Sequence, residues 1–154
     1  MNIPIAEGDG YGFETLFLGC SYKSVDPKHR RGKCLRFRNA LRQAMVIQQQ
    51  LGCDPFHPKT KLAQEIFDYI EDRLHSAGHQ GTLQFFICVG THLDRLGVDC
   101  FFRFNSRIVT IDLYSGKLGG KAKKNKADVV LSRAHFLKDE HLKVAEDIAR
   151  RLIG

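Results

Sequence analysis

Apolar positions recur at two different periods along the chain, and each period predicts one kind of element. Spacing near i, i+3 and i+4 predicts helices over about Pro27–Leu51, Thr60–Ala77 and Asp139–Ile153. A period of two, with many β-branched and aromatic residues, predicts strands over Thr82–Val89, Val98–Phe104, Arg107–Leu113 and Ala127–Leu131. The first 26 residues are rich in glycine, and we expect an irregular lead-in with at most a short strand over Phe13–Leu18.

This order of elements predicts an α/β fold in which helices flank a mixed sheet of four to five strands. The 154 residues are the length of one domain, with a lead-in and basic helix over 1–55 and a core over 60–153. No apolar run reaches the ~18 residues of a membrane span, so we expect no membrane partner. The five cysteines do not pair closely in sequence, which favours a reducing, cytoplasmic location with Cys88 and Cys100 buried in strands.

The hairpin around Asn105-Ser106 places two aspartates together. A short turn at that position pairs residues whose numbers sum to 211, and one face of the hairpin is then almost wholly apolar. On the other face Asp99 lies opposite Asp112, with Cβ atoms ~4.5–5.5 Å apart, where like charges are destabilising. A Mg²⁺ ion between them would offset this cost. Protonation of one aspartate, neutralisation by Arg103 or a lysine, and a register shifted by one residue remain as alternatives.

Positive charge is concentrated in two segments. The net charge is +7, yet Pro27–Gln50 carries seven basic residues and Lys117–Lys126 carries five, both without an acid. Such segregation predicts a polyanionic partner, usually nucleic acid, although a solvated surface without a partner is the alternative. The candidate nucleic-acid-binding residues are Arg30, Arg31, Lys33, Arg36, Arg38, Lys121, Lys123 and Lys124.

The runs Gly97-Val-Asp-Cys-Phe-Phe and Val109-Thr-Ile-Asp-Leu, followed by a lysine-bearing loop, resemble the core of the PD-(D/E)XK, or restriction-endonuclease-like, nuclease superfamily. The resemblance covers roughly residues 60–135 and implies that Asp99 and Asp112 bind Mg²⁺ or Mn²⁺. Tyr114 stands where the pattern has lysine, so Lys117 and Lys126 are the candidates for that catalytic role. The superfamily also takes an acid from its first core helix, which here implies Glu65 or Glu71.

The sequence therefore predicts a Mg²⁺-dependent nuclease that cleaves phosphodiester bonds, acting on DNA in preference to RNA. The resemblance also implies a homodimer. A catalytically degraded nuclease fold that only binds nucleic acid is the alternative. Another is an interaction subunit whose basic helix docks on an acidic protein. His92 and Asp94, in the loop before Asp99, either approach the site or are polar loop residues without a role in it.

Overall fold

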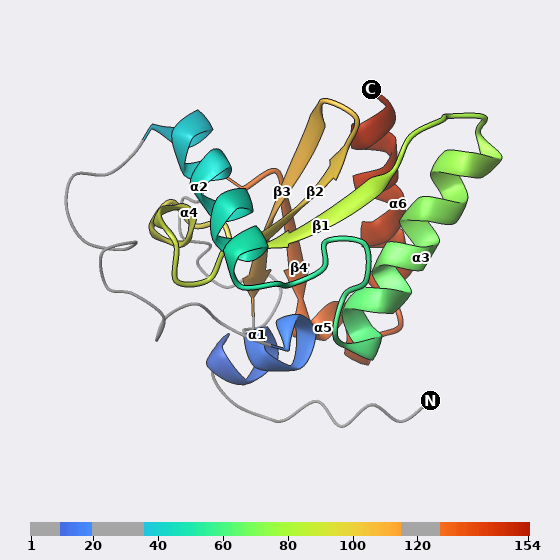
Figure 1. Ribbon diagram of the computed structural model, residues 1–154. Helices are drawn as coiled ribbons and strands as arrows, with labels where there is room; N and C mark the ends of the chain where they lie inside the picture. Colours follow the sequence, from blue (N-terminus) through green and yellow to red (C-terminus); the bar gives the residue numbers. More distant parts are fainter. Residues whose placement is uncertain (1–9, 20–35, 115–126) are drawn as a thin grey trace.

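A four-stranded sheet lies between two layers of helices (Figure 1). The structure is a computed structural model, and it describes residues 10–19, 36–114 and 127–154. In chain order the elements are α1 (Gly10–Leu18), α2 (Phe37–Gln50), α3 (Lys61–Ser76), β1 (Leu83–Ile87), α4 (His92–Arg95), β2 (Cys100–Phe104), β3 (Arg107–Tyr114), β4 (Val129–Ser132), α5 (Arg133–Leu137) and α6 (His141–Ile153). None of the described helices is long and apolar enough to cross a membrane.

The sheet has the strand order β1-β2-β3-β4, and it is mixed. The first three strands are antiparallel neighbours, while β4 runs parallel to β3. A parallel pair requires a crossover connection, and most of the connection from β3 to β4, residues 115–126, lies outside the described residues. These strands confirm the predicted α/β class and the mixed sheet flanked by helices.

The predicted hairpin register is confirmed over the whole ladder between β2 and β3. Cys100 pairs with Ile111, Phe102 with Val109 and Phe104 with Arg107, as the sum of 211 requires. Asn105 has a φ of 57°, the left-handed conformation that a two-residue hairpin turn favours and that asparagine tolerates. The predicted pair of Val98 with Leu113 is wrong, because Val98 precedes β2 and packs on the opposite side of the sheet from Leu113.

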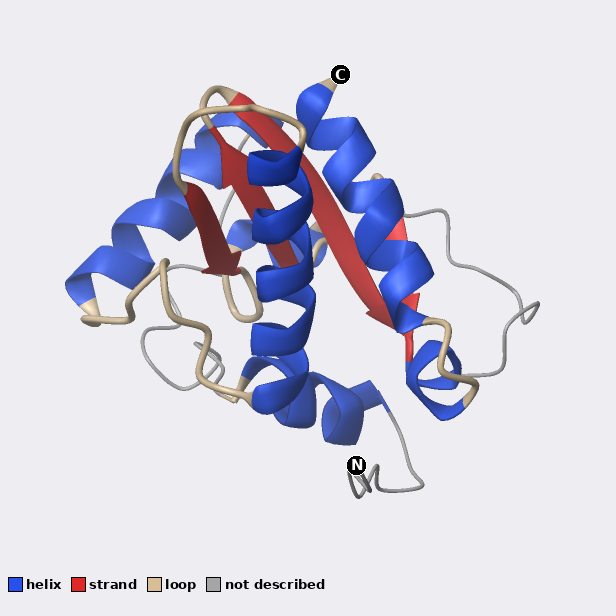
Figure 2. Cartoon of the chain, turned by 90° about the vertical axis from the view of Figure 1, so that its right-hand side faces the viewer, coloured by secondary structure: helices blue, strands red, loops and turns tan. Residues whose placement is uncertain are grey.

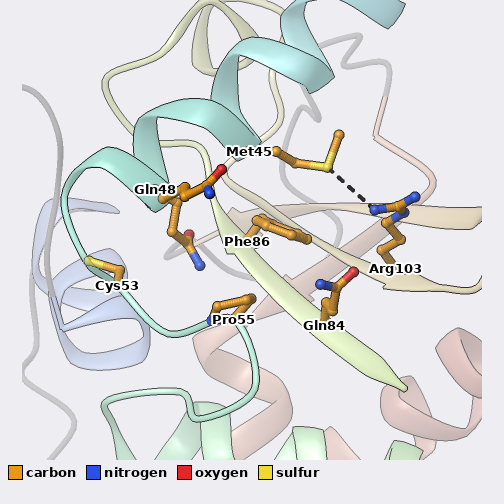
Figure 3. Close-up of a pocket in the computed structure, with 8 residues that line it drawn as sticks. Met45, Gln48, Cys53, Pro55, Gln84, Phe86 and Arg103 are labelled. Carbon is orange, nitrogen blue, oxygen red and sulfur yellow. Dashed lines mark hydrogen bonds between the residues drawn. The ribbon is translucent and has the colours of Figure 1, made fainter. Parts of the chain in front are cut away.

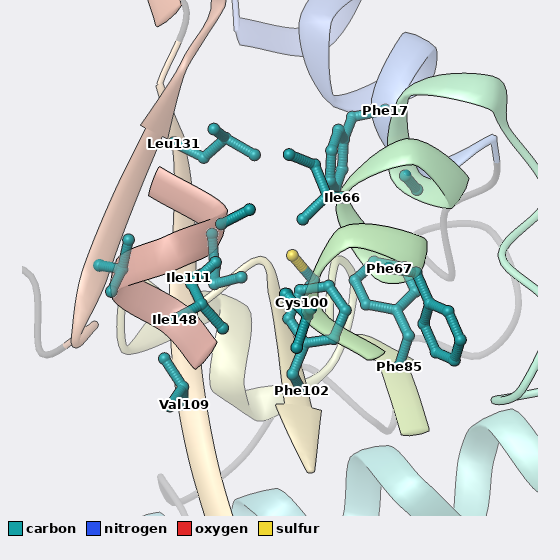
Figure 4. Packing of buried hydrophobic residues seen from close by; sticks show 14 of the residues in the cluster. Phe17, Ile66, Phe67, Phe85, Cys100, Phe102, Val109, Ile111, Leu131 and Ile148 are labelled. Carbon is teal, nitrogen blue, oxygen red and sulfur yellow. The ribbon is translucent and has the colours of Figure 1, made fainter. Parts of the chain in front are cut away.

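Each face of the sheet has its own core. Alternate strand residues such as Phe85, Phe102 and Ile111 pack with α1, α3 and α6 in the larger cluster (Figures 2 and 4). On the other face Phe86 and Phe101 stack with ring centroids 4.9 Å apart, and they pack with alanines of α2 in the smaller cluster. Cys88 and Cys100 are buried as expected, one in each cluster. Helices therefore pack on both faces of the sheet.

Helix α3 closely matches the helix predicted over Thr60–Ala77. The Thr60 hydroxyl accepts a hydrogen bond from the Ala63 N–H at 3.1 Å and so caps the helix, and it also donates to the Phe17 carbonyl oxygen. The buried positions Leu62, Ile66 and Leu74 lie on the face toward the sheet. The capping threonine therefore begins α3 and also ties it to α1.

The lead-in prediction is wrong for Phe13–Leu18, which belongs to helix α1 and not to a strand. Phe13 and Phe17 are one helical turn apart and buried, and both rings contact Phe136 at centroid distances of 5.9 and 6.1 Å. Nine residues give too few turns for the helical period to stand out among the surrounding glycines. The consequence is that residues near the N-terminus reach the central sheet.

Helix α2 covers the smaller cluster and also closes the edge of the sheet. Its described part begins at Phe37, later than predicted, and residues 27–35 of the predicted helix lie outside the described residues. The buried Gln48 amide donates to the Phe85 carbonyl at 2.9 Å and accepts from the Ile87 N–H at 2.8 Å. The Phe85 N–H donates to the Pro55 carbonyl at 2.7 Å. Outward backbone groups of Phe85 and Ile87 on edge strand β1 are therefore satisfied within the chain.

Two short helices, α4 and α5, were not predicted, because four and five residues carry no readable period. The Ser132 hydroxyl accepts from the Ala134 N–H at 3.1 Å, and His135 Nδ1 accepts from the Ser132 N–H at 2.8 Å, which together cap α5. The last strand begins two residues later than expected. Asp128 uses its carboxylate to accept from the Thr110 N–H at 2.9 Å and hydroxyl at 3.0 Å, before the strand begins.

Candidate metal and nucleic-acid site

Asp99 lies at an irregularity of the sheet, immediately before β2. Its N–H donates to the Ile111 carbonyl at 2.9 Å, although Ile111 is already the ladder partner of Cys100. Two residues of one strand facing one residue of the other is the pattern of a β-bulge, which re-aims the side chain. The Asp99 carboxylate accepts from the Leu113 N–H at 2.7 Å and so bonds a backbone group of β3. Backbone geometry therefore fixes where this carboxyl group lies.

The carboxyl groups of Asp99 and Asp112 are hydrogen-bonded to each other. Asp112 lies two residues from Thr110 on β3, and Thr110 pairs with Phe101, so the acidic pair is on the α2 side of the sheet. Asp99 is only 5% exposed, whereas Asp112 is partly exposed. The prediction that these two residues are adjacent on neighbouring antiparallel segments is confirmed, with the bulge in place of direct ladder pairing.

Burial is the main cause that raises the pKa of Asp99 to about 9. The Leu113 N–H opposes the shift, because it stabilises the carboxylate and lowers the pKa. The charge of Glu14 and the hydrogen bond and charge of Asp112 raise the pKa further. Asp99 therefore holds a proton at neutral pH. Of the alternatives to a bound ion, the structure supports protonation of one aspartate.

Glu14, on α1, is the acid that sequence reasoning missed. Helix α1 packs on both α3 and β3, which brings the Glu14 charge within range of Asp99. The available signal was the one-turn spacing of Phe13 and Phe17, which fixes the side of α1 that faces the core. In the described part of the chain no three or more His, Cys, Asp or Glu side chains form a group that could hold a metal ion. Asp99 and Asp112 alone are thus the candidate metal ligands.

The structure does not bring the predicted helix glutamates to this pair. Glu65 bonds to His141 at 2.7 Å, across the interface of α3 and α6, on the other face of the sheet. Glu71 lies on the same helix, whose buried side also faces the larger cluster. Glu65 is therefore engaged with α6, and the contribution of an acid from this helix to the site stays a prediction.

The turn between β1 and β2 borders the pair. The Cys88 N–H donates to the Asp99 carbonyl at 2.8 Å, so the turn starts directly beside the bulge. Asp94 is engaged within the turn, where its carboxylate accepts from the Gly90 N–H at 3.1 Å. The His92 N–H donates to the Gln43 side chain on α2 at 3.2 Å. These polar groups order the turn and attach it to α2.

Of the predicted basic residues, the structure describes only two. Arg36 and Arg38 are exposed at the start of α2, the helix that covers the same sheet face as the acidic pair. The remaining candidates lie outside the described residues: Arg30, Arg31, Lys33, Lys117, Lys121, Lys123, Lys124 and Lys126. Tyr114, at the position where the nuclease pattern has lysine, ends β3 and pairs with Ser132 of β4.

Comparison with models of known protein families, with curated proteins and with solved structures gives no significant match. Any function must therefore be argued from the geometry of this site.

Proposed function

We propose that this chain is a Mg²⁺-dependent nuclease that hydrolyses phosphodiester bonds at Asp99 and Asp112. The proposal depends mainly on one observation, two carboxyl groups in hydrogen-bond contact within a covered sheet face. Folding keeps Asp99 in this pair only at a cost in free energy, since burial disfavours its charge. Strained or perturbed carboxyl pairs of this kind are concentrated at functional sites.

The donor set fits Mg²⁺ or Mn²⁺. These ions bind oxygen ligands and commonly take one or two carboxylates, with waters and substrate phosphate oxygens in the remaining positions. When bound, the ion supplies a water of lowered pKa and neutralises charge on the scissile phosphate. Asp99 must release its proton on binding, and its orientation is already fixed by the Leu113 N–H. Asp112, being partly exposed, is the carboxylate closer to the substrate.

Basic residues supply the substrate binding in this proposal. Arg36 and Arg38 are exposed on the helix that covers this sheet face, where phosphate contacts would position a strand without reading its sequence. We assign the role of the catalytic lysine to Lys117 or Lys126, because both lie in the segment that follows Asp112 and precedes β4. The substrate is nucleic acid, DNA in preference to RNA, and two copies of the chain would allow both strands to be cut.

The experiment compares cleavage of supercoiled plasmid, single-stranded DNA and RNA by the full chain in Mg²⁺, Mn²⁺ and EDTA. Asp99→Asn and Asp112→Asn should abolish metal-dependent cleavage and leave nucleic-acid binding intact. The control Asp72→Asn removes an exposed acid of α3 and should cleave as the wild type does. Lys117→Ala and Lys126→Ala identify the lysine. Normal cleavage by Asp112→Asn would refute the assignment.

A second candidate function follows from Tyr114. Because tyrosine occupies the usual lysine position, the fold can also act as a nucleic-acid-binding protein without catalysis. This function predicts salt-dependent binding of DNA or RNA by the wild type with no cleavage in either metal. Metal-dependent cleavage that both aspartate variants lose would exclude it.

A further inference from the structure

A pocket of about 430 Å³ with both apolar and polar lining residues lies on the same sheet face as the acidic pair, between the second half of α2 and strands β1 and β2 (Figure 3). Its size is within the range of pockets that hold small organic ligands. Gln84 and Arg103 form its side on the sheet and are direct cross-strand partners. Gln48 and Gln49 of α2 also line the pocket, and Phe86 of β1 adds an aromatic side chain to its lining.

The charge of the pocket favours an anion. None of the described residues that line it is acidic, and Arg103 is the one cation among them. Arg103 is half-buried, and its hydrogen-bond partner is the Met45 sulfur at 4.0 Å, a weak acceptor. Within residues 10–19, 36–114 and 127–154 none of the ion pairs involves Arg103. A partly buried guanidinium without a carboxylate is well suited to bind a phosphate group through two parallel hydrogen bonds.

The amides give the pocket a second kind of recognition. The Gln48 amide is fixed by its two bonds to the β1 backbone, so it forms a rigid wall. Gln49 is exposed and Gln84 is half-buried, and each carries both a donor and an acceptor. A glutamine amide can match the donor and acceptor pattern of a base edge. A ligand that carries both a phosphate and a base edge is a nucleotide.

The position of the pocket relative to Asp112 agrees with a nucleic-acid strand that contacts both the pocket and the acidic pair. Arg103 pairs with Ile108, which is on the same face of β3 as Asp112 and four residues away. At about 3.3 Å per residue, this separation is roughly 13 Å, or a few nucleotides of a bound strand.

We propose that this pocket binds a nucleotide, with the phosphate on Arg103 and the base edge on Gln49 and Gln84. Where that nucleotide is part of a strand, the inference rests on the proposed function and adds a subsite a few nucleotides from the cleavage position. A free mononucleotide offers the same chemistry. Binding of a nucleotide in this pocket can therefore be tested without any catalysis.

The test measures binding in EDTA, so that cleavage cannot contribute. The probes are the four deoxynucleoside monophosphates and short single-stranded oligonucleotides, titrated into the full chain. Saturable binding should weaken roughly tenfold or more in Arg103→Gln, because the variant cannot form the charge-assisted hydrogen bonds to phosphate. The control Arg107→Gln removes an exposed arginine from the same hairpin and should bind as the wild type does.

A second pair of variants keeps the test valid if Arg103→Gln unfolds. Gln49→Ala should weaken binding and alter the preference among the four bases, whereas Gln50→Ala, at an exposed neighbour outside the pocket, should not. Binding of mononucleotides supports a site for free ligand, and binding of oligonucleotides alone supports the strand subsite. Equal effects of Arg103→Gln and Arg107→Gln, together with no effect of Gln49→Ala, would overturn the proposal. Pocket binding without any cleavage would instead reject only the nuclease function.

Discussion

Replacing Asp99 with asparagine should stabilise the metal-free fold at neutral pH, and the gain should grow with pH. The folded chain holds the Asp99 proton up to about pH 9, whereas an unfolded aspartate loses it near its ordinary pKa of 3.8. Between these two values the folded state binds more protons, so the free energy of unfolding decreases by about 1.4 kcal/mol per pH unit. Asparagine does not titrate, and its carbonyl oxygen can still accept from the Leu113 N–H.

The gain should be close to zero at pH 4 and reach about 4 kcal/mol at pH 7, a large part of the stability of a domain of this size. Urea unfolding in EDTA at pH 5, 6, 7 and 8 measures it for the wild type, Asp99→Asn and the exposed control Asp72→Asn. The control should show no gain that rises with pH. A difference between Asp99→Asn and the wild type that is constant with pH, or a destabilised variant, would refute the raised pKa of Asp99.

The remaining predictions concern the supporting groups. Gln48→Ala should lower the free energy of unfolding by about 2–4 kcal/mol in urea titrations, since two backbone groups of β1 lose their partner, while Gln50→Ala should change it by less than about 0.5 kcal/mol. Glu14→Gln should lower the pKa of Asp99 in the folded state, so the loss of stability with rising pH, which still begins near pH 3.8, should level off at a lower pH and be smaller in the same unfolding assay. Mg²⁺ affinity, measured by calorimetry, should rise up to about tenfold per pH unit from pH 6 to 9, because the Asp99 proton must leave. The last prediction concerns a variant in which Arg30, Arg31, Arg36 and Arg38 are neutralised together. The slope of log affinity for duplex DNA against log salt concentration should decrease by ~0.9 for each phosphate that the variant no longer neutralises. An unchanged slope would exclude these arginines from the interface.

Much of the sheet was predictable because its signals are local. The turn at Asn105-Ser106 and the alternation on either side determine the register, and the register places Asp112 beside Asp99. The threonine cap and the apolar stripe of α3 are equally local. Such patterns can be read from one sequence since a shift by one residue would turn the apolar side chains to the other face.

The parts that could not be predicted depend on tertiary contacts. Helix α1 is defined by the packing of Phe13 and Phe17 against Phe136, which is far away in the chain. The bulge at Asp99 is visible only in the backbone bond to Ile111. The contact of Glu65 with His141 could not be predicted for a related reason, since helical spacing gives the face of a helix but not the side of the sheet on which it packs.

The closure of strand β1 by Gln48 and Pro55 also bears on how this protein would aggregate. An open strand edge is a template on which another chain can add a strand. Here the template is covered only while α2 remains docked, and the strand beneath it, Leu83–Ile87, is almost entirely apolar. Local opening of α2 would expose that edge before the rest of the fold melts. Aggregation on heating would therefore begin at β1, and its rate would follow the opening of one helix and not global unfolding.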